Sequence, residues 1–120
     1  MLAGNQKIGE ADVEFHIGRR DKLRKAVKKA GADAILVTSV TNVAYLTGFS
    51  GNDSYILVGK GGDVLISDGR FTTQLEEECP DVELDIRPMG KTIFDAVKRV
   101  VSAAKISKLG VESQSMNVAL

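Results

Sequence analysis

Residues 34–71, AILVTSVTNVAYLTGFSGNDSYILVGKGGDVLISDGRF, form the stretch that decides the fold. Short apolar runs lie in it at residues 34–38, 55–58 and 64–67, and their length and β-branched content are typical of strands. The first run is continuous rather than alternating, which predicts a central strand covered on both faces. Residues 59–63 form a glycine-rich hairpin connection between the other two runs, so that pair is antiparallel and the sheet is mixed.

The segment between the first two apolar runs predicts a short helical turn. Ser39 or Thr41 can cap its start, and Gly48 marks its end. This segment therefore connects two strands without a long excursion.

Helical and strand patterns continue on both sides of this stretch. A helix with one apolar face is expected over 17–29, with Gly31 where it stops. The elements expected after it are a short helix over 71–79 stopped by Pro80, a strand over 82–86, a helix over 92–105 capped by Thr92, a strand over 109–112 and the start of a helix capped by Ser113 or Ser115.

This order of elements defines the fold class. Alternating strands and helices predict an α/β domain with three layers, in which a mixed sheet of about five or six strands carries helices on both faces. The 120 residues suit one domain, placed at 16–120, behind a flexible lead-in over 1–15. The sequence stops inside a predicted helix, so we expect a truncated chain.

Composition narrows the function. Sixteen basic residues balance sixteen acidic ones, which gives no general attraction to nucleic acid or to a membrane surface. Basic residues gather over 19–29 and acidic ones over 76–85; these are either two solvated faces or complementary patches that meet in an oligomer. Cys79 is the single cysteine, so an internal disulfide is impossible and a cytoplasmic location is expected.

Few residues could carry chemistry. His16 and Cys79 have no metal-ligand partners at suitable spacing, and we expect His16 to be exposed. Acidic neighbours should raise the pKa of Cys79. Neither a catalytic residue, nor a metal ligand, nor a cofactor site is therefore assigned to this chain.

Two clusters favour function. The first is the segment 42–53, in which small polar residues and glycines surround two aromatic residues in a loop. The second is Asp68-Gly69-Arg70-Phe71, where a strand ends and a helix begins. Asp68 could cap that helix, and Arg70 could present its guanidinium to a carboxylate or pair with Glu76 or Glu77 on the surface.

These clusters carry a family resemblance. The chain resembles the amino-terminal domain of the creatinase, prolidase and aminopeptidase P family. The matching segments, in family order, are Arg20 with Leu23, Asp33 to Thr38, Asn42 to Phe49, Ser67 to Phe71 and Gly110 to Glu112. The resemblance implies a mixed sheet with helices on both sides, followed by a "pita-bread" catalytic domain that lies beyond this chain. In the family that domain holds two divalent metal ions (Mn, Co or Zn) and hydrolyses peptides whose second residue is proline.

The resemblance also implies a role for this chain. It would be a non-catalytic domain that helps to assemble a homo-oligomer, packs with its own C-terminal catalytic domain and narrows substrate access. Arg70 would approach the peptide substrate, and Asn52 and Asp53 lie in the matching loop as further substrate-binding candidates. The family usually has Tyr where this chain has Phe71, so any hydrogen bond from that hydroxyl is lost here.

Two other functions remain open. The same fold resembles a non-catalytic histone chaperone subunit, in which the basic segment 19–29 or the acidic segment 76–85 would bind a partner of opposite charge. Creatinase itself, which hydrolyses a small guanidino compound without metal, is the other. Five metal ligands in the sequence after residue 120 would favour the peptidase over the chaperone.

Overall fold

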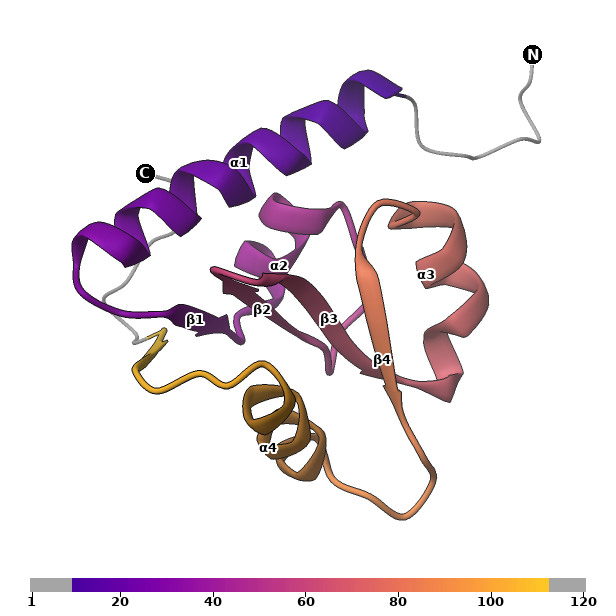
Figure 1. Ribbon diagram of the computed structural model, residues 1–120. Coiled ribbons are helices and arrows are strands. Elements are labelled where there is room, and N and C mark those ends of the chain that lie inside the picture. Colours follow the sequence, from indigo (N-terminus) through magenta and orange to yellow (C-terminus); the bar gives the residue numbers. More distant parts are fainter. Residues whose placement is uncertain (1–9, 113–120) are drawn as a thin grey trace.

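The structure, a computed structural model, describes residues 10–112. Helices and strands alternate along the chain as the sequence predicts (Figure 1). The elements are α1 (Glu10–Lys29), β1 (Ala34–Val37), α2 (Val40–Thr47), β2 (Tyr55–Gly59), β3 (Gly62–Asp68), a 3-10 turn η1 (Gly69–Phe71), α3 (Thr72–Glu78), β4 (Glu83–Arg87), α4 (Ile93–Ala103) and β5 (Leu109–Val111).

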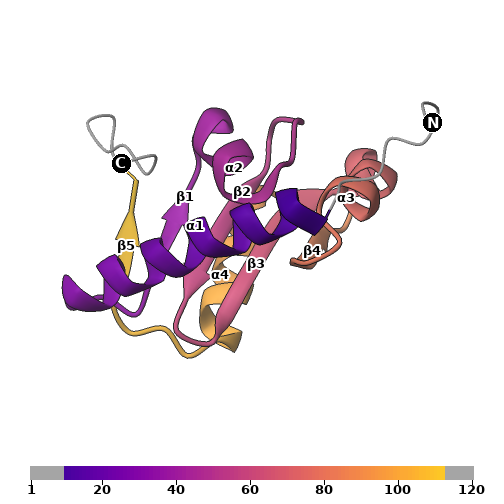
Figure 2. The ribbon, with the colours of Figure 1, turned by 90° about the horizontal axis from the view of Figure 1, so that it is seen from above.

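The five strands form one mixed sheet in the order β4-β3-β2-β1-β5. β2 is antiparallel to both β1 and β3, whereas β5 is parallel to β1 and β4 is parallel to β3. Four strands therefore run the same way, and their carboxyl ends meet at one edge of the sheet beside the start of β2. We call this the carboxyl edge; Figure 2 shows α2 at this end of the strands, opposite the β2–β3 turn.

Helices cover both faces of the sheet, which confirms the three-layer prediction. α1, α2 and α3 pack on one face, over a core that includes Val37, Phe49 and Leu75. α4 packs on the other face, against Leu36 and Ile66 (Figure 1). Neighbouring residues of β1 point alternately to the two cores and all four are buried, as expected of a strand covered on both sides.

The predicted caps and stops are largely confirmed. Ser39 caps α2 by accepting a hydrogen bond from the backbone N–H of Asn42, and Gly48 ends it in the left-handed conformation with φ 82°. Thr92 begins α4 with a reciprocal pair of hydrogen bonds to Asp95. The helix predicted from Ser113 or Ser115 lies outside the described residues.

The start of the domain differs from the prediction. α1 begins at Glu10, so residues 10–15 are helical and not part of a flexible lead-in. The apolar stripe that marks the helix in the sequence begins only at Leu23, so it gives no signal for these first turns. Residues 1–9 lie outside the described part.

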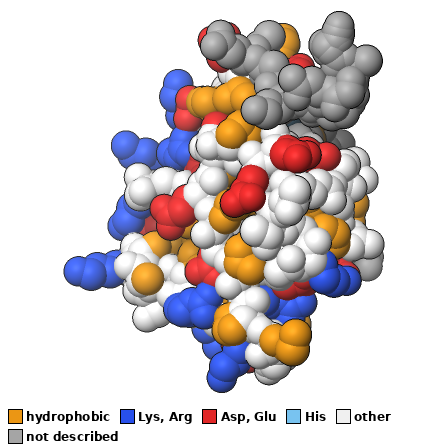
Figure 3. Space-filling view, turned by 90° about the vertical axis from the view of Figure 1, so that its right-hand side faces the viewer, with side chains coloured by type: hydrophobic (Ala, Val, Ile, Leu, Met, Phe, Trp, Pro, Cys, Tyr) orange, Lys and Arg blue, Asp and Glu red, His pale blue; other side chains and the backbone are white. Residues whose placement is uncertain are grey.

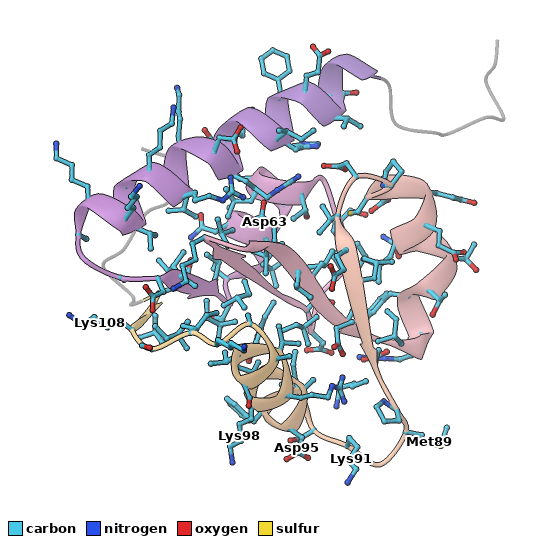
Figure 4. The ribbon with its side chains drawn as sticks, in the orientation of Figure 1. Asp63, Met89, Lys91, Asp95, Lys98 and Lys108 are labelled. Carbon is cyan, nitrogen blue, oxygen red and sulfur yellow. The ribbon has the colours of Figure 1, made fainter. Side chains whose placement is uncertain are left out.

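Arg20 and its partners correct the prediction of two solvated charged faces. Arg20 is only 3% exposed, and its guanidinium donates hydrogen bonds to Asp63 (2.9 Å), Asp81 (2.7 Å) and the carbonyl oxygen of Leu46 (2.8 Å). Figure 4 shows Asp63 between β3 and α1. This buried cluster joins the two charged segments inside the fold because each charge needs a partner once water is excluded.

The acidic segment does not form a continuous patch. Asp81 is used by Arg20, and Asp85 pairs with Arg99 of α4. Figure 3 shows acidic, basic and apolar side chains interspersed on the visible side of the molecule. The segment 76–85 is therefore a weaker candidate for a partner-binding patch than its composition suggests.

Candidate functional site at the carboxyl edge

Arg70 is positioned by the end of β3. Asp68, the last residue of that strand, accepts a hydrogen bond from the backbone N–H of Arg70 (2.9 Å) and so caps the turn η1, as predicted. This tight turn directs the Arg70 side chain back to the carboxyl edge. Arg70 consequently does not pair with Glu76 or Glu77, and that alternative prediction is wrong.

The Arg70 guanidinium is held by two carboxylates. Its Nε and Nη2 atoms donate to the two oxygens of Asp68 at 2.9 and 2.8 Å, and Nη2 also reaches Asp53 at 3.2 Å. No acceptor among residues 10–112 contacts Nη1 of Arg70, and 59% of the side chain is exposed. One edge of the guanidinium is therefore fixed while the other is available to a ligand.

Electrostatics favour the charged forms of both Asp68 and Arg70. The side-chain hydrogen bonds from Arg70 hold the pKa of Asp68 well below its usual range, although partial burial opposes the shift. The same bonds, first to Asp68 and then to Asp53, raise the pKa of Arg70 above its ordinary value. The pair stays charged, so the site presents a permanent, oriented cation.

Arg87 belongs to the site and was missed by sequence reasoning. It ends β4, where it lies opposite Asp68 in the parallel β3–β4 pairing. Its Nη2 donates to the second oxygen of Asp68 (3.3 Å), and its Nη1 donates to the carbonyl oxygen of Lys91 (2.7 Å). The pairing register that brings the two residues together is not visible in the sequence.

The structure separates the two predicted loop residues. Asp53 adopts a positive φ of 51° and contacts Arg70, so it joins the site. The Asn52 side chain is exposed and has no hydrogen bond to Arg70, while its backbone carbonyl accepts one from Ser54 (3.0 Å). Asn52 therefore shapes the loop that presents Asp53.

Glu112 joins β5 to the start of α2 at the other end of the carboxyl edge. Its carboxylate accepts hydrogen bonds from the backbone N–H groups of Thr38 (3.0 Å) and Ser39 (2.6 Å) and from the side chain of Asn42. Burial opposes the effect, but these donors hold the pKa of Glu112 below its usual value. Three segments of the family resemblance thus meet here, and the carboxylate that follows β5 fixes the start of α2.

The Phe71 ring packs against the hydrophobic core. Its ring packs edge-on against Phe49 with centroids 5.4 Å apart and an interplanar angle of 79°. Phe49 is fully buried in the core under α2 and α3. The aromatic ring that follows Arg70 therefore anchors the turn through packing, which needs no hydroxyl.

His16 and Cys79, the two residues considered for reactivity, both have buried side-chain atoms. The His16 ring packs against Gly48, and its Nδ1 atom is buried, so the prediction of an exposed residue is wrong. Cys79 is 1% exposed, and burial raises the pKa of its thiol to about 12. The predicted direction is confirmed, with acidic neighbours as a lesser cause.

The described residues contain no group of three or more His, Cys, Asp or Glu side chains placed to hold a metal ion. Over the same part of the chain, none of the helices has the length and apolar character needed to cross a bilayer. The site at the carboxyl edge is thus a cluster of ion pairs on an α/β domain.

Comparison with known proteins agrees with this class of domain. The family model of the Creatinase/Prolidase N-terminal domain matches residues 19–120. The uncharacterized peptidase YqhT of Bacillus subtilis is 32% identical over 96 residues, which are 80% of this chain and 27% of that protein.

Solved structures show the same fold. The N-terminal domain of the cytoplasmic peptidase PepQ from Mycobacterium tuberculosis superposes with a TM-score of 0.73 and 36% identity, covering 85% of this chain and 78% of that one. The Xaa-Pro dipeptidase of Bacillus anthracis gives a TM-score of 0.77 with 27% identity, covering 87% of this chain and 29% of that one. The chain belongs to the creatinase/prolidase N-terminal domain family, and it spans about a quarter of the length of its curated relative.

Proposed function

We propose that this chain is the non-catalytic N-terminal domain of a metal-dependent Xaa-Pro aminopeptidase or dipeptidase, in which Arg70 binds the peptide. The observation that carries the proposal is the Arg70 guanidinium, which Asp68 and Asp53 hold at the carboxyl edge while Nη1 has no acceptor among residues 10–112 and the side chain is 59% exposed. Relatives named as peptidases, among them an Xaa-Pro dipeptidase, support the reaction class.

The geometry suits peptide binding more than bond cleavage. A guanidinium fixed along one edge can donate from the other to a peptide carbonyl or a terminal carboxylate, which orients the peptide without reacting with it. Asp68 holds Arg70 directly, and Arg87 acts on Arg70 only through its hydrogen bond to Asp68. The chain thus contributes to substrate access, and Asp53 borders the same path.

The two divalent ions of such an enzyme, Mn, Co or Zn, do not fit among residues 10–112, because those residues offer no cluster of suitable ligands. Their ligands would come from a C-terminal catalytic domain, the partner against which this domain would pack. Assembly into a homo-oligomer and a cytoplasmic location complete the proposal. The location is supported by the PepQ relative, which is named a cytoplasmic peptidase, and by the single buried cysteine.

The test compares this 120-residue chain with the same chain extended through its C-terminal domain. Both are assayed for hydrolysis of Xaa-Pro peptides with added Mn²⁺, Co²⁺ or Zn²⁺. We expect activity in the extended protein alone, and we expect Arg70→Ala to raise KM or lower kcat with metal content unchanged. Inactivity of both proteins would favour a binding module over a peptidase domain.

A further inference from the structure

A hollow of about 260 Å³ lies at the carboxyl edge, and one of its lining residues, Asp53, contacts Arg70. Its walls come from segments far apart in the sequence: Thr38, Val40, Asp53, Tyr55, Arg87 and Ile93. The adjacent strands β3 and β4 lead to α3 on one face of the sheet and to α4 on the other. Arg87 and Ile93 thus place one wall of the hollow next to the point where connections diverge to opposite faces of the sheet, which is where α/β sheets bind ligands.

The charges around the hollow are already paired. Asp53 is joined to Arg70 at 3.2 Å, and Arg87 is joined to Asp68 at 3.3 Å. These two anions and two cations balance, so a charged group entering the hollow would displace an existing ion pair and pay for its own desolvation. The hollow consequently favours a neutral occupant.

The remaining walls are largely apolar. Val40 and Ile93 are the first residues of α2 and α4, and Val40 is 50% exposed. Tyr55 adds a partly buried aromatic ring. The volume is well above the roughly 30 Å³ that one water occupies, and it lies below the roughly 300–1,000 Å³ of pockets for whole small molecules. It suits a single side chain.

We propose that this hollow is a subsite for one apolar side chain of the peptide that Arg70 binds. The inference rests on the proposed function and extends it to specificity. Asp53 connects the two parts, because it lines the hollow and also contacts the Arg70 guanidinium. A peptide whose backbone reaches Nη1 of Arg70 can place a neighbouring aliphatic side chain between Val40 and Ile93.

The test uses the 120-residue chain labelled with ¹⁵N and titrated with the tripeptides Ala-Pro-Leu and Ala-Pro-Asp. An isolated N-terminal domain of this family, that of PepQ, has been crystallised, so the domain is a suitable unit for binding studies. We expect saturable amide shift changes at Thr38, Tyr55 and Ile93, with affinity for the leucine peptide about tenfold above that for the aspartate peptide.

Two matched variants locate the effect. Val40→Asp and Phe94→Asp each place a carboxylate in the first turn of a helix, where it is tolerated, at positions that are 50% and 63% exposed. Val40 lines the hollow and Phe94 does not. We expect Val40→Asp to weaken binding of the leucine peptide about tenfold and Phe94→Asp to leave it within about twofold.

Equal affinities for the two peptides, or shift changes confined to another surface, would overturn the subsite. Shift changes at the hollow that depend on protein concentration in the absence of peptide would show that a second copy of the chain fills it. This result would also overturn the subsite. Kinetics of the extended protein separate this proposal from the one before it. Peptide binding without hydrolysis would retain the subsite and remove the peptidase function, whereas hydrolysis unaffected by Val40→Asp would do the reverse.

Discussion

Asp68 is the residue on which the carboxyl edge depends. Its two oxygens accept four hydrogen bonds, three from Arg70 and one from Arg87. It thereby combines a capping role in the backbone with an electrostatic role in the site. A single carboxylate fixes both the turn that carries Arg70 and the orientation of the guanidinium.

Replacing that carboxylate by an amide separates the two roles. Asp68→Asn keeps a capping oxygen but loses the charge, so we expect Arg70 to be held less firmly while the fold persists. The measurement is hydrogen exchange of the Arg70 Nε–H, which should become faster. Glu83→Gln, an exposed change on β4, is the control. Unchanged exchange in the Asp68 variant would show that the negative charge of Asp68 is not needed to hold Arg70.

His16 makes stability depend on pH. Burial, followed by the charge of Arg19, lowers its pKa from 6.5; Arg20 acts in the same direction, while Asp81 and Asp12 oppose the shift. The unfolded chain then binds a proton more readily than the folded one, so the contribution is present above pH 6.5 and lost as the pH falls toward the folded value.

The test of His16 is urea unfolding at pH 7.5, 6.5 and 5.5. We expect the free energy of unfolding to decline across this series and His16→Gln to flatten the decline. The chain has only one histidine, so no other imidazole contributes. An unchanged slope in the variant would assign the dependence to another group.

At the scale of elements, α1 and α2 are joined by polar groups as well as by their shared apolar core. Arg19 and Arg20 donate to the carbonyl oxygens of Tyr45 (2.9 Å) and Leu46 (2.8 Å), which lie in the last turn of α2. The guanidiniums thus satisfy carbonyls that lack partners within the helix and complement its dipole. Gly48 follows directly and lies against the His16 ring.

Gly48 is required for this junction. Its φ is 82°, and a Cβ there would come within 2.5 Å of Cε1 of His16. We expect Gly48→Ala to destabilise the fold by about 2 kcal/mol through backbone strain and the clash. Thermal unfolding measures this, with Gly61→Ala, where a Cβ meets nothing within 4 Å, as the control. A double-mutant cycle with His16→Ala should recover part of the loss, and strict additivity would contradict the proposed contact.

Replacing Arg20 tests how much the buried ion cluster contributes to stability. Arg20→Ala leaves Asp81, which is 10% exposed, without an ion-pair partner, whereas Asp63, which is 11% exposed, keeps its ion pair with Arg24. We expect a loss of about 3–5 kcal/mol in the free energy of unfolding, because an uncompensated buried charge is costly. Lys22→Ala, on the exposed side of the same helix, should change it little. A loss below about 1 kcal/mol would mean that water reaches the Asp81 carboxylate.

The elements themselves were predictable because their signals are local. The apolar runs, the cap residues Ser39 and Thr92, and the glycine-rich hairpin are all defined within a few residues. The start of α1 was not predictable in this way, since the apolar stripe of this helix begins only at Leu23. The site divides similarly: the Asp68 cap is local, whereas Asp53 reaches Arg70, and Arg87 reaches Asp68, only through the pairing of strands.

At the scale of the whole molecule, residues 10–112 bring together no group of three or more His, Cys, Asp or Glu side chains that could hold a metal ion. Two hydrophobic cores, one on each face of the sheet, hold the layers together. We therefore expect EDTA to leave the Tm of the 120-residue chain unchanged, as measured by circular dichroism with added Mn²⁺ as the comparison. A fall in Tm with EDTA would reveal a metal site that includes other residues.

The position of Cys79 makes it a natural probe of opening of the fold. The only sulfhydryl of the chain is buried at the C-terminal end of α3. It donates a hydrogen bond to the carbonyl oxygen of Thr47 at 3.5 Å. A thiol-specific chromogenic reagent added to the native protein will thus react only with molecules whose interior has opened. The rate of colour development therefore measures how often the domain opens, and no engineered cysteine is needed.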